Sequence, residues 1–177
     1  MTESEENSME DRLPVKICII GSCFDLSQKL VRLNTDRLTN SKFFLTTGSE
    51  ISEKRMKLKE RFYRLILNVL SGKEFFVKLR PSSYRGSSGC LILFDKGDLA
   101  SFKVVSNWYQ DFRKTVSNSS VPIGIIGIQS EHEAVTTDEG KLLAEQLKVV
   151  YYETAINDKE QVNHILYNML ESIDQNV

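Results

Sequence analysis

Short apolar runs alternate with amphipathic segments along most of the chain. Residues 15–20 are rich in β-branched side chains and lie between Pro14 and Gly21, which predicts a buried strand. Apolar residues after Leu26 recur at helical spacing, so a helix is expected to follow that strand. Further short apolar runs predict buried strands at 90–94, 121–128 and 149–152.

Three more helices are expected between and after these strands. Residues 99–115 place apolar side chains on one helical face, and Thr136 with Glu139 matches a capping box that opens another helix. Asn157 with Glu160 repeats that spacing before a final helix, whose apolar positions are Val162, Ile165, Leu166, Met169, Leu170 and Ile173. Strands that alternate with helices predict an α/β fold, with a mainly parallel sheet covered on both faces.

The stretch 51–77 is compatible with two structures. Its apolar residues can form one face of a helix, with lysines and arginines on the opposite face. Alternatively, the alternation over 63–69 predicts a strand that a turn at Lys59 and Glu60 joins to an earlier strand. Periodicity alone does not decide between these two structures.

The segment 13–33 has the order of a phosphate-binding loop, namely a strand, a glycine and a helix. The side chains that such a loop needs are absent, because the positions of the second glycine, the lysine and the magnesium-binding hydroxyl hold Leu26, Ser27 and Gln28. Asp25 is a preferred N-cap residue. We therefore hypothesise that its carboxylate fills the anion site from within the chain.

Composition narrows the function classes. The 177 residues are enough for one domain, and a formal net charge of −1 gives no reason to expect binding to nucleic acid or to an anionic membrane. Residues 1–12 are acidic, lack the apolar core of a secretory signal and are expected to form a disordered tail before a domain at 13–177. The cysteines have no metal-ligand spacing, and no motif supports a catalytic pair of Cys23 with His132.

Several motifs occur in order, at spacings typical of one family. They are Ser83-Tyr84-Arg85-Gly86 before Leu91-Ile92-Leu93-Phe94-Asp95, then Ser101-Phe102, Asn107-Trp108, Val121-Pro122-Ile123, Thr137 to Leu147 and Glu153-Thr154. From about Val15 to Ile173 the chain resembles small GTPases of the Ras superfamily, with the Rab branch the most similar. The resemblance implies a P-loop NTPase fold, with a mainly parallel six-stranded sheet and helices on both faces. It also implies two strands in the stretch 51–77.

The same resemblance locates losses in the nucleotide motifs. In this alignment Val69 replaces the magnesium-linked aspartate and Lys73 the glutamine that positions water, while the guanine-contacting motifs begin at Ile128 and at Ala155, with Asn157 in place of a lysine. Each charge-assisted contact contributes roughly 1.5–3 kcal/mol. Losing three of them removes about 6 kcal/mol, on the order of four decades in affinity. The positions that would still contact a nucleotide are Gly21, Thr46, Gly72, Gln129 and Glu131.

We therefore expect a pseudo-GTPase with no catalytic residues, no cofactor and no metal, which binds a protein partner through the surfaces that correspond to the family's switches. It would be a cytoplasmic subunit or adaptor, recruited by its partner to a membrane or cytoskeletal complex, for example in vesicle trafficking. The expected partner-binding residues are Phe44, Leu45, Ile51, Phe75, Phe76 and Leu79.

Three further expectations belong to this interpretation. The family's aromatic effector triad falls on Ile51, Asn68 and Ser83, so ordinary Rab partners are not implied. The C-terminal residues lack the cysteine that prenylation requires. The basic run from Lys54 to Arg64 is either a solvated strand face or a site for an acidic partner. The alternative function is a divergent switch that binds GTP or GDP weakly, with or without Mg²⁺.

Overall fold

The computed structural model describes residues 13–38 and 44–176, and the expected tail at 1–12 lies outside this range. Its elements follow one another in the order β1 (Leu13–Ile20), α2 (Phe24–Asn34), β2 (Arg37–Leu38), α3 (Phe44–Thr47), β3 (Ser49–Leu58), β4 (Arg61–Leu70), η1 (Glu74–Leu79), α4 (Arg80–Tyr84), β5 (Gly89–Asp95), α5 (Leu99–Lys103), α6 (Val105–Thr115), β6 (Ile123–Ile128), α7 (Thr137–Leu147), β7 (Val150–Thr154) and α8 (Lys159–Asp174).

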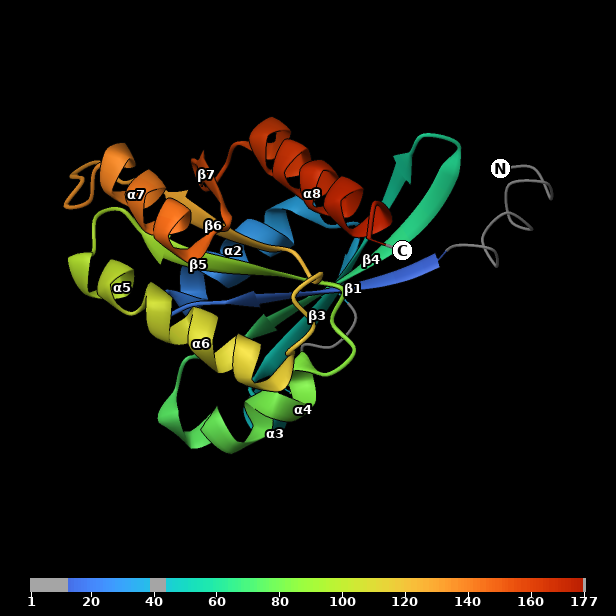
Figure 1. The fold of residues 1–177 in the computed structure, drawn as a ribbon, viewed down its shortest axis with the longest axis horizontal. Helices are drawn as coiled ribbons and strands as arrows, with labels where there is room; N and C mark the ends of the chain where they lie inside the picture. The colour runs from blue at the N-terminus through green and yellow to red at the C-terminus, as the bar shows by residue number, and fades with distance from the viewer. Residues whose placement is uncertain (1–12, 39–43, 177) are drawn as a thin grey trace.

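One sheet runs through the centre of the molecule, in the strand order β2-β3-β4-β1-β5-β6-β7 (Figure 1). Strands β4, β1, β5, β6 and β7 are parallel, whereas β3 is antiparallel to both β4 and β2. The predicted six strands and the mixed, mostly parallel order are confirmed, and the two-residue β2 adds a seventh strand at the edge of the described sheet.

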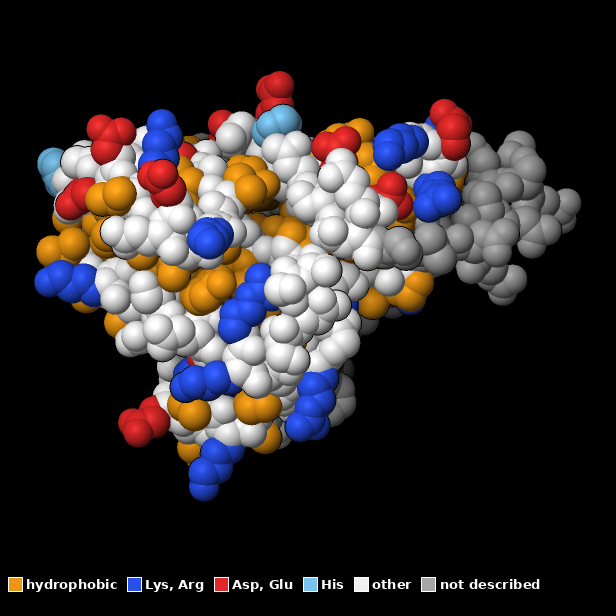
Figure 2. All heavy atoms as spheres, in the orientation of Figure 1, with side chains coloured by type: hydrophobic (Ala, Val, Ile, Leu, Met, Phe, Trp, Pro, Cys, Tyr) orange, Lys and Arg blue, Asp and Glu red, His pale blue; other side chains and the backbone are white. Residues whose placement is uncertain are grey.

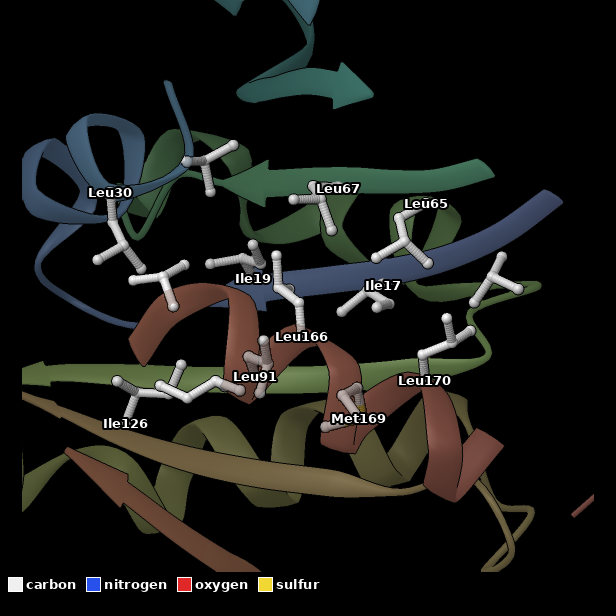
Figure 3. Packing of buried hydrophobic residues seen from close by; sticks show 14 of the residues in the cluster. Ile17, Ile19, Leu30, Leu65, Leu67, Leu91, Ile126, Leu166, Met169 and Leu170 are labelled. Carbon is white, nitrogen blue, oxygen red and sulfur yellow. The ribbon is translucent and has the colours of Figure 1, made fainter. Parts of the chain in front are cut away.

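Each face of the sheet carries its own hydrophobic core. On one face α2 and α8 pack on the inward side chains of β1, β4 and β5, as Figure 3 shows for Ile17, Ile19 and Leu166. On the other face α4, α6 and α7 pack on Cys18, Ile92 and their neighbours. The predicted apolar stripe of the last helix is confirmed, since all six of its named residues are buried.

The stretch 51–77 contains two strands rather than a helix. Strands β3 and β4 pair from Ser49↔Leu70 to Leu58↔Arg61, so the predicted turn at Lys59 and Glu60 is confirmed. Tyr63, Leu65, Leu67 and Val69 are buried, whereas Phe62 and Arg64 are exposed. Burial that alternates along β4 is the reason why period-2 packing prevails over the helical pattern.

Two helix predictions need correction. The expected helix at 99–115 is divided into α5 and α6, because the β-branched Val104 has φ −96° and ψ 1°, outside the helical range. Asn157 does not cap α8; Asp158 does, since its side chain accepts a hydrogen bond from the backbone N–H of Gln161. The capping box of Thr136 and Glu139 is confirmed at the start of α7.

Candidate functional site

The loop between β1 and α2 is short because α2 begins at Phe24, three residues after Gly21. Gly21 has φ +143°, and a Cβ there would lie 2.2 Å from the carbonyl oxygen of Leu93, so only glycine fits this close approach. Cys23 is the N-cap residue and makes no side-chain capping hydrogen bond. Asp25 is an exposed residue of the first helical turn, so the hypothesis that it caps the helix is wrong.

A cavity of about 800 Å³ lies over this loop, where β1 and β4 end. Ligands of doubly wound α/β folds bind beyond the carboxyl ends of the strands, so this is the expected place for a ligand. Its lining combines the N-terminal turn of α2 with the segment that follows β4, and includes Ser22, Cys23, Asp25, Gln28, Arg32, Gly72, Lys73 and Asp95.

A buried carboxylate lies beside the cavity and is bonded to two residues of its lining. Glu50, on β3, has a side chain that is 1% exposed. Its Oε2 accepts a hydrogen bond from Gln28 Nε2 at 2.7 Å and one from Arg32 Nη2 at 2.5 Å, and its Oε1 accepts one from Arg32 Nε at 2.8 Å. We call these three residues the Glu50 cluster. It ties β3 to α2 with a bidentate ion pair and a neutral hydrogen bond.

The neighbouring position on β4 is apolar. Val69 pairs with Glu50 across the two strands, is 0% exposed and belongs to the core under α2 and α8. Ser27 is also buried, and its hydroxyl donates to the carbonyl of Cys23 within the helix. Of the α2 residues that line the cavity, Gln28 and Arg32 are bonded to Glu50, whereas Asp25 is exposed.

The segment after β4 is fixed by Arg80. Its Nη2 donates to the carbonyl of Gly72 at 2.8 Å, and its guanidinium lies over the Trp108 ring, 4.4 Å from the centroid. Asp111 lies 3.8 Å from Nη1 and accepts a hydrogen bond from the hydroxyl of Tyr84 at 2.7 Å. This set of contacts, the Arg80 clamp, holds η1 and α4 against α6.

A second buried cation lies among the loops after β5, β6 and β7. Lys96 is 1% exposed, and its Nζ lies 2.5 Å from Glu153 Oε1 and 2.9 Å from Glu133 Oε2. Thr137 and Tyr151 both donate hydroxyl hydrogen bonds to Glu153. Burial favours the neutral acid, but the hydrogen bonds from Lys96, Thr137 and Tyr151 outweigh it, so the pKa of Glu153 is lowered.

Similarity to known proteins is consistent across nearly the whole chain. The family model described as "Ras family" matches residues 16–175. The chain belongs to the Ras family. It is 30% identical to Ras-related protein Rab-11B of Dictyostelium discoideum, over 89% of this chain and 73% of that protein. It is 29% identical to Ras-related protein RabC of the same organism, over 94% and 87%, and 26% identical to Ras-related protein SEC4 of Saccharomyces cerevisiae, over 92% and 76%.

Within this Ras-family fold, Gly72 lines the cavity, and the other positions expected to contact a nucleotide lie outside its lining. Gly72 lies close behind Gly21, since a Cβ on Gly72 would be 3.2 Å from the Gly21 carbonyl oxygen. Thr46 is exposed on the four-residue α3. Gln129 and Glu131 are exposed after β6, next to the β7 end, because the Gln129 N–H donates to the carbonyl of Thr154.

The expected partner-binding residues divide into exposed and buried ones. Phe75 is 83% exposed and Leu79 is 41% exposed, both on η1. Phe76 is 7% exposed and packs so closely on Gly48 that a Cβ there would meet its ring, so its assignment to the partner surface is wrong. Ile51 is half-buried, and the side chains of Phe44 and Leu45 lie outside the described ones.

Cys23, the residue considered above for a catalytic pair with His132, is a half-buried free thiol. Cys23 donates to the carbonyl of Leu93, and burial raises the pKa of its thiol to about 11. A thiol with such a pKa is almost entirely protonated near neutral pH, so it is a poor nucleophile. His132 is exposed after β6 and no contact joins it to Cys23 among the described residues.

Three residues of the site escaped sequence reasoning, namely Glu50, Lys96 and Arg80. Each is a charged side chain that becomes buried only through tertiary packing. The one available signal was position, since Glu50 and Lys96 adjoin segments that end at the ligand-binding edge of the sheet.

Over the described residues, no helix is long and apolar enough to span a bilayer, and no group of three potential metal ligands occurs.

Replacing Arg32 with methionine tests the Glu50 cluster. Because Glu50 would keep only the neutral amide of Gln28, we expect Arg32→Met to lower the free energy of unfolding by about 2 kcal/mol. The double variant Arg32→Met/Glu50→Gln should recover part of this loss, as measured by urea denaturation. Lys29→Met, at an exposed position of the same helix, is the matched control, and an equal cost for both single variants would contradict the cluster's role.

The pH dependence of stability tests the Lys96 network. The lowered pKa of Glu153 means that its contribution is present above about pH 5 and is lost as the pH falls, because the unfolded chain binds that proton first. At pH 7 we expect Lys96→Met to cost about 3 kcal/mol, and this cost should shrink between pH 5 and pH 3. Denaturation curves at several pH values measure it, with the exposed Lys141→Met as control. A cost that is constant with pH would refute the assignment.

Proposed function

We propose that this Ras-family protein is a nucleotide-independent protein-binding module. The observation that carries the proposal is the Glu50 cluster, in which two residues of the cavity lining, Gln28 and Arg32, bond to a buried carboxylate beside it. Gln28, at the position of the metal-binding hydroxyl, donates directly to Glu50, and the Arg32 guanidinium supplies the positive charge. The cluster joins β3 to α2 through side chains of the chain itself.

The side chains around the cavity support weak affinity for a magnesium nucleotide. The Val69 side chain has no oxygen that could bind a metal ion, and the uncharged Ser27 cannot neutralise a phosphate. The cavity lining contains two carboxylates, Asp25 and Asp95, and two cations, Lys73 and Arg32, of which Arg32 is already paired with Glu50. Without a site for Mg²⁺ and without the glutamine that orients water, we expect no hydrolysis.

The surface proposed for the partner is η1 with its neighbours. Phe75, Val77 and Leu79 are exposed apolar residues within five positions, and Lys73 and Lys78 flank them. Figure 2 shows orange side chains between blue ones on the projection where Figure 1 places α4. Because the Arg80 clamp holds this segment against α6, we infer that it is presented in a single conformation, as an adaptor or complex subunit requires.

A divergent guanine-nucleotide switch is the second candidate. The cavity of about 800 Å³ is of the size of small-molecule sites, and the N-terminus of the 11-residue α2 faces it. Backbone N–H groups at a helix start favour anions without any lysine. Glu131 and Gln129 supply polar groups near the end of β6 for a base.

Nucleotide titration separates these two functions. We expect GTP, GDP and ATP, each with and without Mg²⁺, to leave the melting temperature of the purified protein unchanged. A ligand at 100 times its dissociation constant would add about 2.7 kcal/mol, a shift on the order of 8 °C for a chain of this size. A saturable shift with guanine but not adenine nucleotides would favour the switch.

Charge placed on η1 tests the partner surface. We expect Phe75→Glu/Leu79→Glu to lose at least about ten-fold of the main partner's binding, because two exposed apolar contacts become carboxylates. Quantitative affinity purification in nucleotide-free buffer measures the loss. Leu142→Glu, an equally exposed apolar position on α7, is the control for folding and charge. Equal recovery of the partner by both variants would place the interface on another face.

A further inference from the structure

The β3–β4 hairpin has an exposed face with three cations around an aromatic ring. Arg55 is exposed, the side chains of Lys57 and Arg64 are 50% and 46% exposed, and Phe62 is 47% exposed with Lys57 Nζ 5.5 Å from its ring centroid. Antiparallel pairing places Arg55 opposite Arg64 and Lys57 opposite Phe62, so all four share one side of the ribbon. We call these four residues the basic hairpin face.

This face has an excess of positive charge. Like charges directly opposite each other destabilise an antiparallel pair, and Arg55 and Arg64 are such a pair. Glu53 lies 4.0 Å from Arg64, and Glu60 lies 3.5 Å from Lys57. Among the described residues, no carboxylate lies within ion-pair distance of the Arg55 guanidinium. Lys59 and Arg61, at the turn, share Asp174.

The charge of opposite sign belongs to the N-terminal residues. Residues 1–12 contain five carboxylates and one arginine, a formal charge of −4, so the rest of a chain with net charge −1 carries +3. The near-neutral total therefore conceals a separation of charge along the sequence.

The N-terminal segment is attached beside the basic hairpin face. β1 begins at Leu13, which pairs with Tyr63, and Pro14 pairs with Arg64. Figure 1 shows the start of β1 next to the projecting end of β3 and β4. Two strand spacings, about 10 Å, separate β1 from β3. Twelve residues span up to about 40 Å, so every cation of the face is within reach.

We propose that the basic hairpin face is a docking site for an acidic segment, and that its occupant within this chain is residues 1–12. Tethering gives that segment an effective concentration of the order of millimolar, which favours it over a free acidic peptide of equal intrinsic affinity. The five carboxylates of the segment would neutralise the Arg55–Arg64 pair. The site is separate from the cavity and from η1, so it holds whatever the nucleotide state.

Competition with a peptide in trans tests the occupant. The probe is a fluorescein-labelled peptide with the sequence of residues 1–12, followed by fluorescence anisotropy at low ionic strength. We call the variant without these five negative charges the neutralised chain; it carries Glu3→Gln/Glu5→Gln/Glu6→Gln/Glu10→Gln/Asp11→Asn. The neutralised chain should bind the peptide about ten-fold more tightly than wild type. That factor corresponds to a site that its own segment occupies about nine-tenths of the time.

Two further substitutions locate the binding site. Adding Arg55→Gln/Arg64→Gln to the neutralised chain should abolish the gain, while the melting temperature should not fall, because a like-charge pair has been removed. Adding Lys103→Gln/Lys114→Gln instead removes the same charge from exposed positions elsewhere and should leave the gain intact. Equal probe affinity for wild type and the neutralised chain overturns the proposal, as does a gain that survives Arg55→Gln/Arg64→Gln.

Other occupants give distinguishable results. If a second copy supplied the segment, wild type would form dimers in sedimentation experiments. Dimer formation and exclusion of the probe would then depend on protein concentration in the same way. This result would overturn the assignment within the chain. If the face instead bound a lipid surface, the neutralised chain would gain binding to phosphatidylserine vesicles but not to the peptide. None of these outcomes depends on the partner of η1, so the failure of one proposal leaves the other standing.

Discussion

A carboxylate buried in a sheet must have a counter-charge, and this requirement organises the ligand-binding edge of the molecule. Glu50 is almost completely removed from solvent, and the energetic penalty for leaving it unpaired exceeds that of any single hydrogen bond nearby. Arg32 meets the requirement from α2, with half of its own side chain still in water. The direction of α2 relative to β3 is therefore set by an ion pair that the chain itself provides.

The other connections at this edge follow the same principle. Lys96 joins the ends of β5 and β7 to the start of α7, and Arg80 joins the segment after β4 to α6. In each case one cation from a loop or helix meets carbonyls or carboxylates from two other elements. Hydrogen bonds and ion pairs within the chain therefore hold these loops in place. In other sites, by contrast, the loops become ordered only when an anionic ligand binds.

Most of the fold could be predicted from the sequence, because the spacing of apolar residues indicates which side of each helix or strand is buried. Strands such as β1 and β5 are short apolar runs, and the apolar stripe of α8 was complete in the pattern. The stretch 51–77 was undecided, since Leu65 and Val69 satisfy both the helical and the strand period, and only pairing between β3 and β4 resolves it. Val104 ended a predicted helix for a local steric reason that hydrophobic pattern does not record.

The candidate site could be predicted less well than the fold. The replaced motif positions stay a prediction that rests on counting from Gly21. The sequence did not predict which side chains lie around the cavity. Asp25 was expected to cap α2, but Cys23 is the N-cap residue. Phe76 was expected on the surface, but its ring packs beside Gly48. Ion pairs between residues 18 positions apart, as in Arg32 and Glu50, have no signature along the chain.

The early start of α2 has a consequence for any attempt to build a phosphate-binding loop into this fold. A phosphate-binding loop curls before its helix begins, whereas here the corresponding residues already form the first helical turn. Placing glycine, lysine and serine at positions 26, 27 and 28 would thus supply the side chains of a phosphate-binding loop on a backbone that is still helical. A phosphate-binding loop at this place would require unwinding of that turn as well as exchange of its side chains.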